Sequence, residues 1–165
     1  MTSFVKNFFT ISLLILTFAL TGCASGRYHK SLEVPGALTP SPQGLAWPLS
    51  GPVLKHFGAT EDGVTLKGMV LAAREGQDVR AAQSGVVAYT DESMRGYGRT
   101  LIVEHSGGLA TVYARNAQIL VLMGERVTKG QVIARSGSSG KGEAPQLYFE
   151  VRRDSRPIDP RQILV

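Results

Sequence analysis

The stretch QLYFEVR, residues 146–152, alternates regularly between two kinds of side chain. Successive side chains of a β-strand point to opposite faces of a sheet, so this alternation predicts a strand with one buried face. The apolar side chains expected on the core face are Leu147, Phe149 and Val151. The side chains expected on the opposite face are Tyr148, Glu150 and Arg152. The stretch therefore predicts a sheet with a hydrophobic core on one side and polar chemistry on the other.

The sequence around this strand, from Leu45 to the end, is typical of an all-β domain. Fifteen glycines fall between short runs rich in β-branched residues, and no stretch keeps a helical apolar period. The expected strands are Met69–Ala73, Gly85–Thr90, Thr100–His105, Leu109–Ala114, Ile119–Leu122, Gln131–Ser136 and Gln146–Arg152. Short strands separated by glycine-rich loops predict an antiparallel β-sandwich or barrel-like fold.

The N-terminal segment indicates export. Residues 8–20 carry no charge and are mostly apolar, but they are fewer than the ~20 residues that a transmembrane helix needs. They lead into Leu20-Thr21-Gly22-Cys23, which resembles the lipobox of bacterial lipoproteins. We therefore expect residues 1–22 to be a lipoprotein signal peptide and Cys23 to carry the lipid. A plain signal peptide followed by a free thiol remains the alternative.

A tether is expected between the lipid and the folded domain. Residues 23–44 contain Pro35, Pro40 and Pro42 and no apolar periodicity, which is typical of a flexible, partly extended linker. Residues 45–165 then form the domain. The chain has one cysteine, which excludes an internal disulfide framework, and a formal net charge of +5. Positive charge this small and scattered suits an anionic envelope partner rather than nucleic acid.

The residues themselves indicate no catalytic centre. His56 and His105 are far apart in sequence, and neither has a second ligand nearby at metal-binding spacing, so both are expected to be structural. Ser138-Ser139-Gly140-Lys141 matches S-x-x-K, but it lies in a glycine-rich loop and the partner motifs of that enzyme class are absent. Glu61 and Asp62 are expected to be solvated loop acids. We expect no cofactor.

An ordered set of motifs nevertheless resembles a known family, the LytM domain of bacterial cell-wall peptidases, from Trp47 to about Leu164. The motifs are Trp47–Pro52, Phe57-Gly58, Gly76-x-x-Val79-x-Ala81, Gly85-Val86-Val87, Gly96-Tyr97-Gly98, Val103-Glu104-His105, Gly124–Ala134, Gly137–Gly140, Leu147–Arg152 and Asp159-Pro160. The resemblance implies an antiparallel, lysostaphin-type β-fold with glycine-rich loops.

The same resemblance implies that the catalytic centre is degenerate. Active members are zinc endopeptidases whose ligands come from an H-x-G-x-D motif and from the second His of H-x-H. The corresponding positions here are Leu66, Val70 and Tyr148, and the positions of the two catalytic histidines are Arg115 and Gln146. Leucine and valine have no lone pair to donate, so the resemblance predicts neither zinc binding nor hydrolysis.

Within that family the chain resembles the degenerate LytM domains of the EnvC and NlpD group of murein hydrolase activators. This implies a non-catalytic activator of periplasmic N-acetylmuramoyl-L-alanine amidases in cell separation, which binds its partner through the emptied groove. The residues expected to line that groove are Leu66, Lys67, Val70, Tyr113, Arg115, Gln146, Tyr148 and Arg152.

Two alternatives remain open at this point. The domain is either such an activator or a peptidoglycan-binding or envelope-scaffold module. Leu66, Val70 and Tyr148 either contact a partner or only fill a closed pocket. Ala24 after Cys23 favours the periplasmic face of the outer membrane, with the lipid as the membrane attachment. The sequence identifies neither the partner amidase, the triggering signal, the route of recruitment to the septum nor the oligomeric state.

Overall fold

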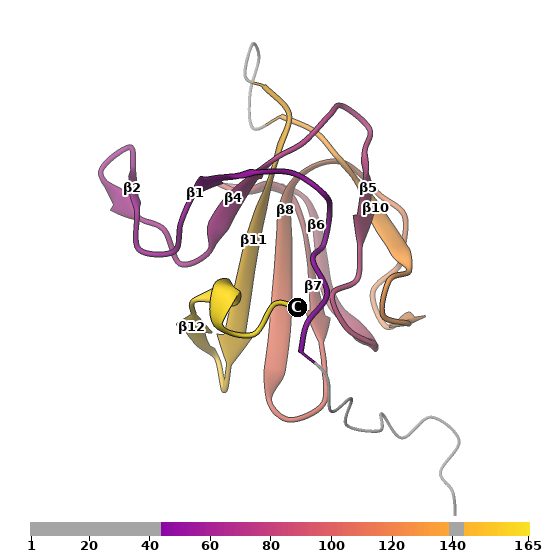
Figure 1. Ribbon diagram of the computed structural model, residues 1–165. Helices are drawn as coiled ribbons and strands as arrows, with labels where there is room; N and C mark the ends of the chain where they lie inside the picture. Colours follow the sequence, from indigo (N-terminus) through magenta and orange to yellow (C-terminus); the bar gives the residue numbers. More distant parts are fainter. Residues whose placement is uncertain (1–43, 139–143) are drawn as a thin grey trace, which may run out of the picture. The chain divides into compact units, whose positions relative to one another are not determined.

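The computed structural model describes residues 44–138 and 144–165, and its secondary structure is almost entirely β-strand (Figure 1). The strands are β1 (Val53–Lys55), β2 (Thr60–Glu61), β3 (Val64–Thr65), β4 (Met69–Ala72), β5 (Asp78–Arg80), β6 (Gly85–Met94), β7 (Gly98–Glu104), β8 (Leu109–Ile119), β9 (Arg126–Val127), β10 (Val132–Ser136), β11 (Gln146–Arg153) and β12 (Arg156–Ile158). A short 3-10 helix, Pro160–Gln162, follows. The predicted signal peptide and Cys23 lie outside the described residues.

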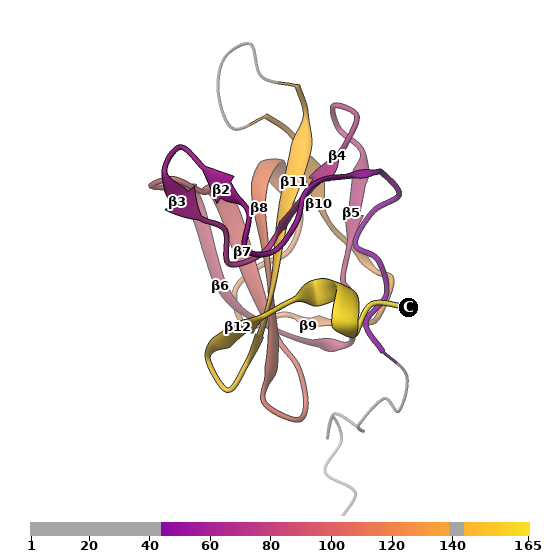
Figure 2. The ribbon, with the colours of Figure 1, turned by 60° about the vertical axis from the view of Figure 1, so that its left-hand side comes forward.

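Ten of the strands form one sheet, and the predicted antiparallel all-β class is confirmed. The order along the sheet is β1-β4-β11-β8-β7-β6-β9, with β12 paired to β11 and with β10 paired to both β5 and β8. Strands β2 and β3 form a separate hairpin. In both Figure 1 and Figure 2 this hairpin and the β5–β10 pair lie on opposite sides of the domain.

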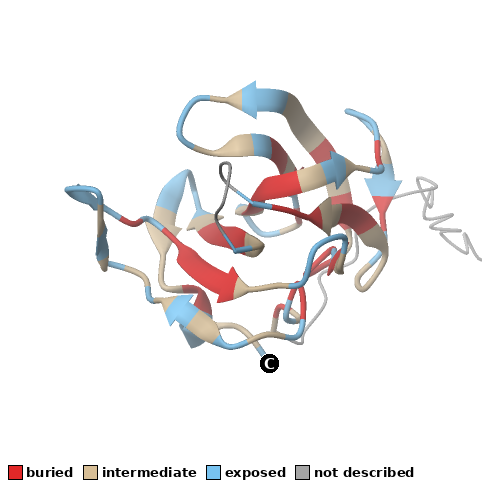
Figure 3. Ribbon diagram, turned by 90° about the horizontal axis from the view of Figure 1, so that it is seen from above, coloured by how far each residue is buried: buried red, intermediate tan, exposed pale blue. Residues whose placement is uncertain are grey.

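Strand β11 runs through the middle of the sheet, and its predicted alternation is confirmed. Leu147, Phe149 and Val151 have no exposed surface and belong to the main hydrophobic core. The other face carries Tyr148, Glu150 and Arg152, which are linked by hydrogen bonds. Figure 3 shows the same distribution over the domain, with buried residues inside the strands and exposed ones at the turns.

Strand β8 has a local backbone irregularity, a bend, at Arg115. Its pairing with β11 ends at Ala114 and its pairing with β10 begins at Asn116, while β7 pairs with β8 on both sides of Arg115. Arg115 has a φ of 67°, and its backbone N–H donates to the carbonyl of Tyr97. A non-glycine residue in this region costs on the order of 1 kcal/mol or more. The bend brings Ile133 of β10 into the same core as Phe149.

One predicted strand is wrong. Ile119 ends β8, and Leu120–Leu122 lie outside the strands because the chain turns there. The turn is closed by Glu125, whose N–H donates to the Leu122 carbonyl and whose carboxylate accepts from the Leu122 N–H. Strands β1, β2, β3, β5, β9 and β12 were not predicted, since two or three residues are too few to show alternation. Within residues 44–138 and 144–165, no helix has the length and apolarity to cross a bilayer.

Candidate functional site

Two segments far apart in sequence, residues 66–70 and strand β11, meet on the face of the sheet opposite the main core, which we call the front face. Leu66, Val70 and Tyr148, together with Ala114, form a small buried cluster that is separate from the main core. The register of the sheet causes this, because Tyr148 on β11 pairs with Val70 on β4 and with Ala114 on β8. These are the three positions at which the sequence resemblance implies zinc ligands in active peptidases.

Gly68, between the first two of these positions, is required by close packing. A Cβ at this residue would lie 2.4 Å from the carbonyl oxygen of Phe149 and 2.9 Å from the Cα of Glu150. No side chain fits there without movement of the β11 backbone. The approach of this segment to β11 therefore keeps Leu66 and Val70 against Tyr148.

The cluster does not suit a metal ion. Leu66 and Val70 offer no donor atom, and the Tyr148 hydroxyl donates to Oε2 of Glu150 at 2.8 Å. Burial, followed by the charge of Glu150, raises the pKa of Tyr148 above its ordinary value, so the phenol stays protonated. Over the part of the chain that the structure describes, no three His, Cys, Asp or Glu side chains form a metal-binding group. The residues at the three positions therefore supply no metal ligand.

A buried carboxylate organises the polar side chains beside the cluster. Glu150 has no exposed surface, and it accepts hydrogen bonds from the Tyr148 hydroxyl at 2.8 Å and from Nε of Arg152 at 2.6 Å. Burying a charge is unfavourable unless it is paired and hydrogen-bonded, and both conditions hold here. Tyr148, Glu150 and Arg152 therefore form a hydrogen-bonded row along β11.

The guanidinium group of Arg115 lies over the Tyr148 ring of the cluster. Its guanidinium carbon lies 5.9 Å from the centre of the Tyr148 ring, and its Nη2 lies 2.6 Å from Oε2 of Glu61. Glu61 also accepts a hydrogen bond from Nζ of Lys55 at 2.6 Å. Burial by itself raises the pKa of Glu61, but the hydrogen bonds and charges of Arg115 and Lys55 outweigh it and lower the pKa. The ion pair fastens the β2–β3 hairpin to the sheet.

These elements enclose a groove of about 470 Å³. The β2–β3 hairpin forms one wall, and the turn between β6 and β7 forms another. The Tyr97 ring in that turn packs edge-to-face on Tyr148, with ring centres 5.3 Å apart. The groove is lined by Glu61, Asp62, Val64, Thr65, Leu66, Lys67, Gly96, Tyr97, Arg115 and Tyr148. It combines apolar and aromatic surface with two cations and two carboxylates.

The structure places four of the eight predicted groove residues on this surface, namely Leu66, Lys67, Arg115 and Tyr148. Val70 lies fully buried beneath them. Gln146 begins β11, where it pairs with Ala72 and does not line the groove. Arg152 lines a second hollow farther along the sheet.

The placement of Tyr113 in the groove is wrong. Tyr113 pairs with Phe149 across β8 and β11, so its side chain lies on the core face. Its hydroxyl accepts a hydrogen bond from the N–H of Ala82 at 2.8 Å, and it has no exposed surface. The sequence shows Tyr113 close to Arg115, but the positive φ of Arg115 disrupts the alternation between them.

The sequence interpretation missed Glu61 and Tyr97. Glu61 is only part-exposed and ion-paired, instead of being a solvated loop acid. Tyr97 lies in the glycine-flanked motif Gly96-Tyr97-Gly98, and an aromatic residue between two glycines was the available signal. His105 is buried: its ring nitrogens contact the Ser84 carbonyl and the Thr111 hydroxyl, which is a structural role.

Comparison with known proteins identifies relatives of this β-domain. Residues 65–160 match the Peptidase family M23. A Pseudomonas aeruginosa lipoprotein named NlpD/LppB homolog is 39% identical over 125 residues, which covers 76% of this chain and 41% of the relative. The murein hydrolase activator EnvC of Escherichia coli K12 is 42% identical over 123 residues, which covers 73% of this chain and 29% of the relative.

A solved structure shows the same architecture. Csd3 of Helicobacter pylori, in its hexagonal crystal, has a TM-score of 0.65 and 29% sequence identity, with 74% of this chain and 33% of that chain covered. The present chain thus spans less than half the length of each of these three relatives. What it shares with all of them is the β-domain that carries the groove.

Proposed function

The chain belongs to peptidase family M23, and we propose that it is a non-catalytic activator of a periplasmic N-acetylmuramoyl-L-alanine amidase, acting in cell separation. The observation that carries the proposal is the cluster of Leu66, Val70 and Tyr148. The fold brings together the three positions at which the resemblance implies zinc ligands, and none of the three residues suits zinc. A related domain in Escherichia coli belongs to a protein named as a murein hydrolase activator.

The non-catalytic part of the proposal rests on coordination chemistry. A hydrolytic zinc site needs three protein ligands and one water, and the metal makes that water nucleophilic at neutral pH. Leucine and valine supply no ligand, and the protonated Tyr148 hydroxyl is engaged by Glu150. The residues at the two catalytic histidine positions do not replace that chemistry either, since Arg115 pairs with Glu61 and Gln146 lies outside the groove.

The activator part rests on the character of the groove. Tyr97, Tyr148 and Leu66 provide apolar and aromatic surface, while Lys67 is an exposed cation at its edge. Aromatic anchors in a pocket with a polar rim are the usual centre of a protein interface. A partner segment with apolar side chains and an acidic residue would complement them. The proposed occupant is therefore a segment of the amidase.

The proposed location follows from the N-terminus and the relatives. The Pseudomonas aeruginosa relative is named as a lipoprotein. We place the mature chain on the periplasmic face of the outer membrane, attached through Cys23, with residues 24–44 as the tether. An acylated chain with a flexible tether would keep the groove within reach of the cell wall.

The test uses the chain from residue 23 with Cys23→Ser, so that no lipid is needed. It is mixed with each purified amidase of the same bacterium and with dye-labelled sacculi, and dye release is followed. At least one amidase should release dye ten-fold faster or more with the chain present. Stimulation of none of them would overturn the proposal. Strong co-sedimentation with sacculi in that case would indicate the scaffold role.

A further inference from the structure

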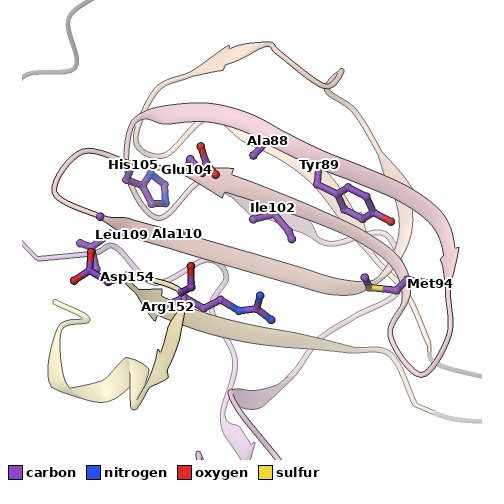
Figure 4. Close-up of a pocket in the computed structure, with 12 residues that line it drawn as sticks. Ala88, Tyr89, Met94, Ile102, Glu104, His105, Leu109, Ala110, Arg152 and Asp154 are labelled. Carbon is purple, nitrogen blue, oxygen red and sulfur yellow. The ribbon is translucent and has the colours of Figure 1, made fainter.

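The front face of the sheet continues past the groove into a second hollow of about 720 Å³. We call it the strand-face hollow, and the residues of it that matter here are Tyr89, Met94, Ile102, Glu104, Ala110 and Arg152. Figure 4 shows these side chains arranged over β6, β7, β8 and β11. Nothing in the proposed function so far uses this surface.

Strand register places the hollow on the same face as the groove. Arg152 lies opposite Ala110 on β8, and Ala110 lies opposite Glu104 on β7. On the next strand pair, Ile102 lies opposite Tyr89. Directly opposed residues of a sheet share a face, and Arg152 shares its face with Tyr148. Ile102 and Ala110 make the floor of the hollow apolar. The register places this floor on the same face of the sheet as the floor of the groove.

The groove and the strand-face hollow adjoin each other. Met94, the last residue of β6, lines the hollow, and Gly96, two residues later in the turn to β7, lines the groove. On β11 Tyr148 lines the groove and Arg152 lines the hollow, and the buried Glu150 lies between them and is hydrogen-bonded to both. At about 3.3 Å per residue, Tyr148 and Arg152 are ~13 Å apart along the strand. A helical segment of roughly nine residues covers that length.

Charge differs between the two ends of this combined surface. The groove end carries one exposed cation, Lys67, and one exposed carboxylate, Asp62, while the charge of Arg115 is paired with Glu61. The far end of the hollow carries two exposed carboxylates, Glu104 and Asp154. A segment with a basic residue over Glu104 and Asp154 and an acidic residue next to Lys67 would pair with exposed charges at both ends.

We propose that the amidase segment does not stop at the groove but continues into the strand-face hollow. Its acidic end lies at Lys67, its apolar middle covers Ile102 and Ala110, and its basic end lies at Glu104 and Asp154. This inference rests on the proposed function, since the occupant is a segment of the activated amidase. It adds the length and the orientation of that segment.

The first test compares two variants that carry the same acidic substitution. Ile102→Glu puts a charge in the floor of the hollow, whereas Leu122→Glu puts it on an exposed turn outside both hollows. The concentration of chain that gives half-maximal amidase stimulation should rise at least ten-fold for Ile102→Glu and stay within two-fold for Leu122→Glu. The thermal midpoint of each variant shows whether it is folded.

Lys67→Glu separates the two proposals. If Lys67→Glu abolishes stimulation while folded Ile102→Glu leaves it unchanged, the inference is overturned and the proposed function stands. If the unsubstituted chain stimulates no amidase, both are overturned. If Ile102→Glu weakens only co-sedimentation with sacculi, the hollow binds cell wall and the inference is again overturned.

A cross-linking test does not depend on Ile102→Glu folding. In the Cys23→Ser background, a benzophenone label is attached at Lys67→Cys in one sample and at Ala110→Cys in another. Both labels should react with the same short segment of the purified amidase, with its acidic end toward position 67. Reaction at position 67 alone, or with two unrelated segments, would contradict a continuous occupant.

Discussion

The hydroxyl of Tyr148 lies 2.8 Å from Oε2 of Glu150, a carboxylate that has no exposed surface. This contact stands where the family resemblance implies a metal ligand. Because the Tyr148 hydroxyl donates its proton to a buried carboxylate, it stabilises the fold and does not coordinate a metal ion. The hydrogen bond from Tyr148 to Glu150 therefore stabilises this part of the fold, and several measurable properties follow from the contacts around it.

Tyr148→Phe should destabilise the domain, because it leaves one oxygen of the buried Glu150 carboxylate without its donor. The expected loss in the free energy of unfolding is about 1–3 kcal/mol. Urea unfolding followed by circular dichroism measures it. Tyr89→Phe is the matched control, since it removes a hydroxyl that donates to Asp91 at the same distance but outside the buried interior. Equal losses in the two variants would contradict the role given to Glu150.

The Glu61–Arg115 ion pair should contribute far more than the Glu61–Lys55 pair. The side chain of Arg115 is 9% exposed and that of Lys55 is 40% exposed. Glu61→Gln leaves the buried guanidinium without its anion and should cost up to about 3 kcal/mol. Lys55→Gln should cost at most about 1 kcal/mol, because water screens an exposed pair. The same unfolding assay applies, and a greater loss for Lys55→Gln would refute the assignment.

Stability should fall as the pH is lowered below about 6.5, because of His105. Burial lowers the pKa of His105 below its ordinary value, although the hydrogen bond to the Ser84 carbonyl opposes this. The unfolded chain then binds a proton more readily than the folded one, so protonation favours unfolding. The stabilisation is complete above the ordinary pKa and is lost toward the lower folded pKa. Urea midpoints between pH 7.5 and 5 measure the effect, and His105→Gln should flatten the slope.

Introducing the ligands that the family resemblance implies should create a zinc site. Because the backbone still brings positions 66, 70 and 148 together, the triple variant Leu66→His, Val70→Asp, Tyr148→His should hold stoichiometric zinc. Elemental analysis after dialysis gives the zinc content. Leu66→His alone is the control and should retain almost none. A triple variant that folds but binds no zinc would show that the three positions do not form a ligand set.

Lys67→Ala should reduce amidase stimulation several-fold without changing the thermal midpoint, because Lys67 is exposed at the groove and supports nothing beneath it. Leu122→Ala, on the exposed turn between β8 and β9, serves as the control for a neutral surface change. Dye release from labelled sacculi is the readout. Full stimulation by folded Lys67→Ala would remove this cation from the proposed interface.

The alternation of apolar and polar side chains predicted the strands whose structure depends on local sequence. Period-two patterning in residues 146–152 correctly assigned both faces of β11, and with them Tyr148 and its neighbours. The same reasoning failed at Tyr113, because the backbone of Arg115 adopts a positive φ that the residue type does not reveal. Strands of two or three residues, such as β2 and β3, carry too few side chains for any periodicity.

The rest of the candidate site depends on contacts across long stretches of sequence. Glu61 and Arg115 are 54 residues apart, and only the folded chain brings them together. A glutamate in a hairpin is usually solvated, so composition alone gave no reason to pair it. The strand-face hollow also arises from the register of four strands, which is a property of the whole sheet.

Arg115 turns the path of β8 and also supplies a cation to the groove, so shape and charge are set by a single residue. A substitution of Arg115 that changes the charge of the groove would therefore also change the backbone conformation of β8. Anyone redesigning the specificity of this surface should leave Arg115 unchanged and begin with Lys67, which is exposed at the edge of the groove.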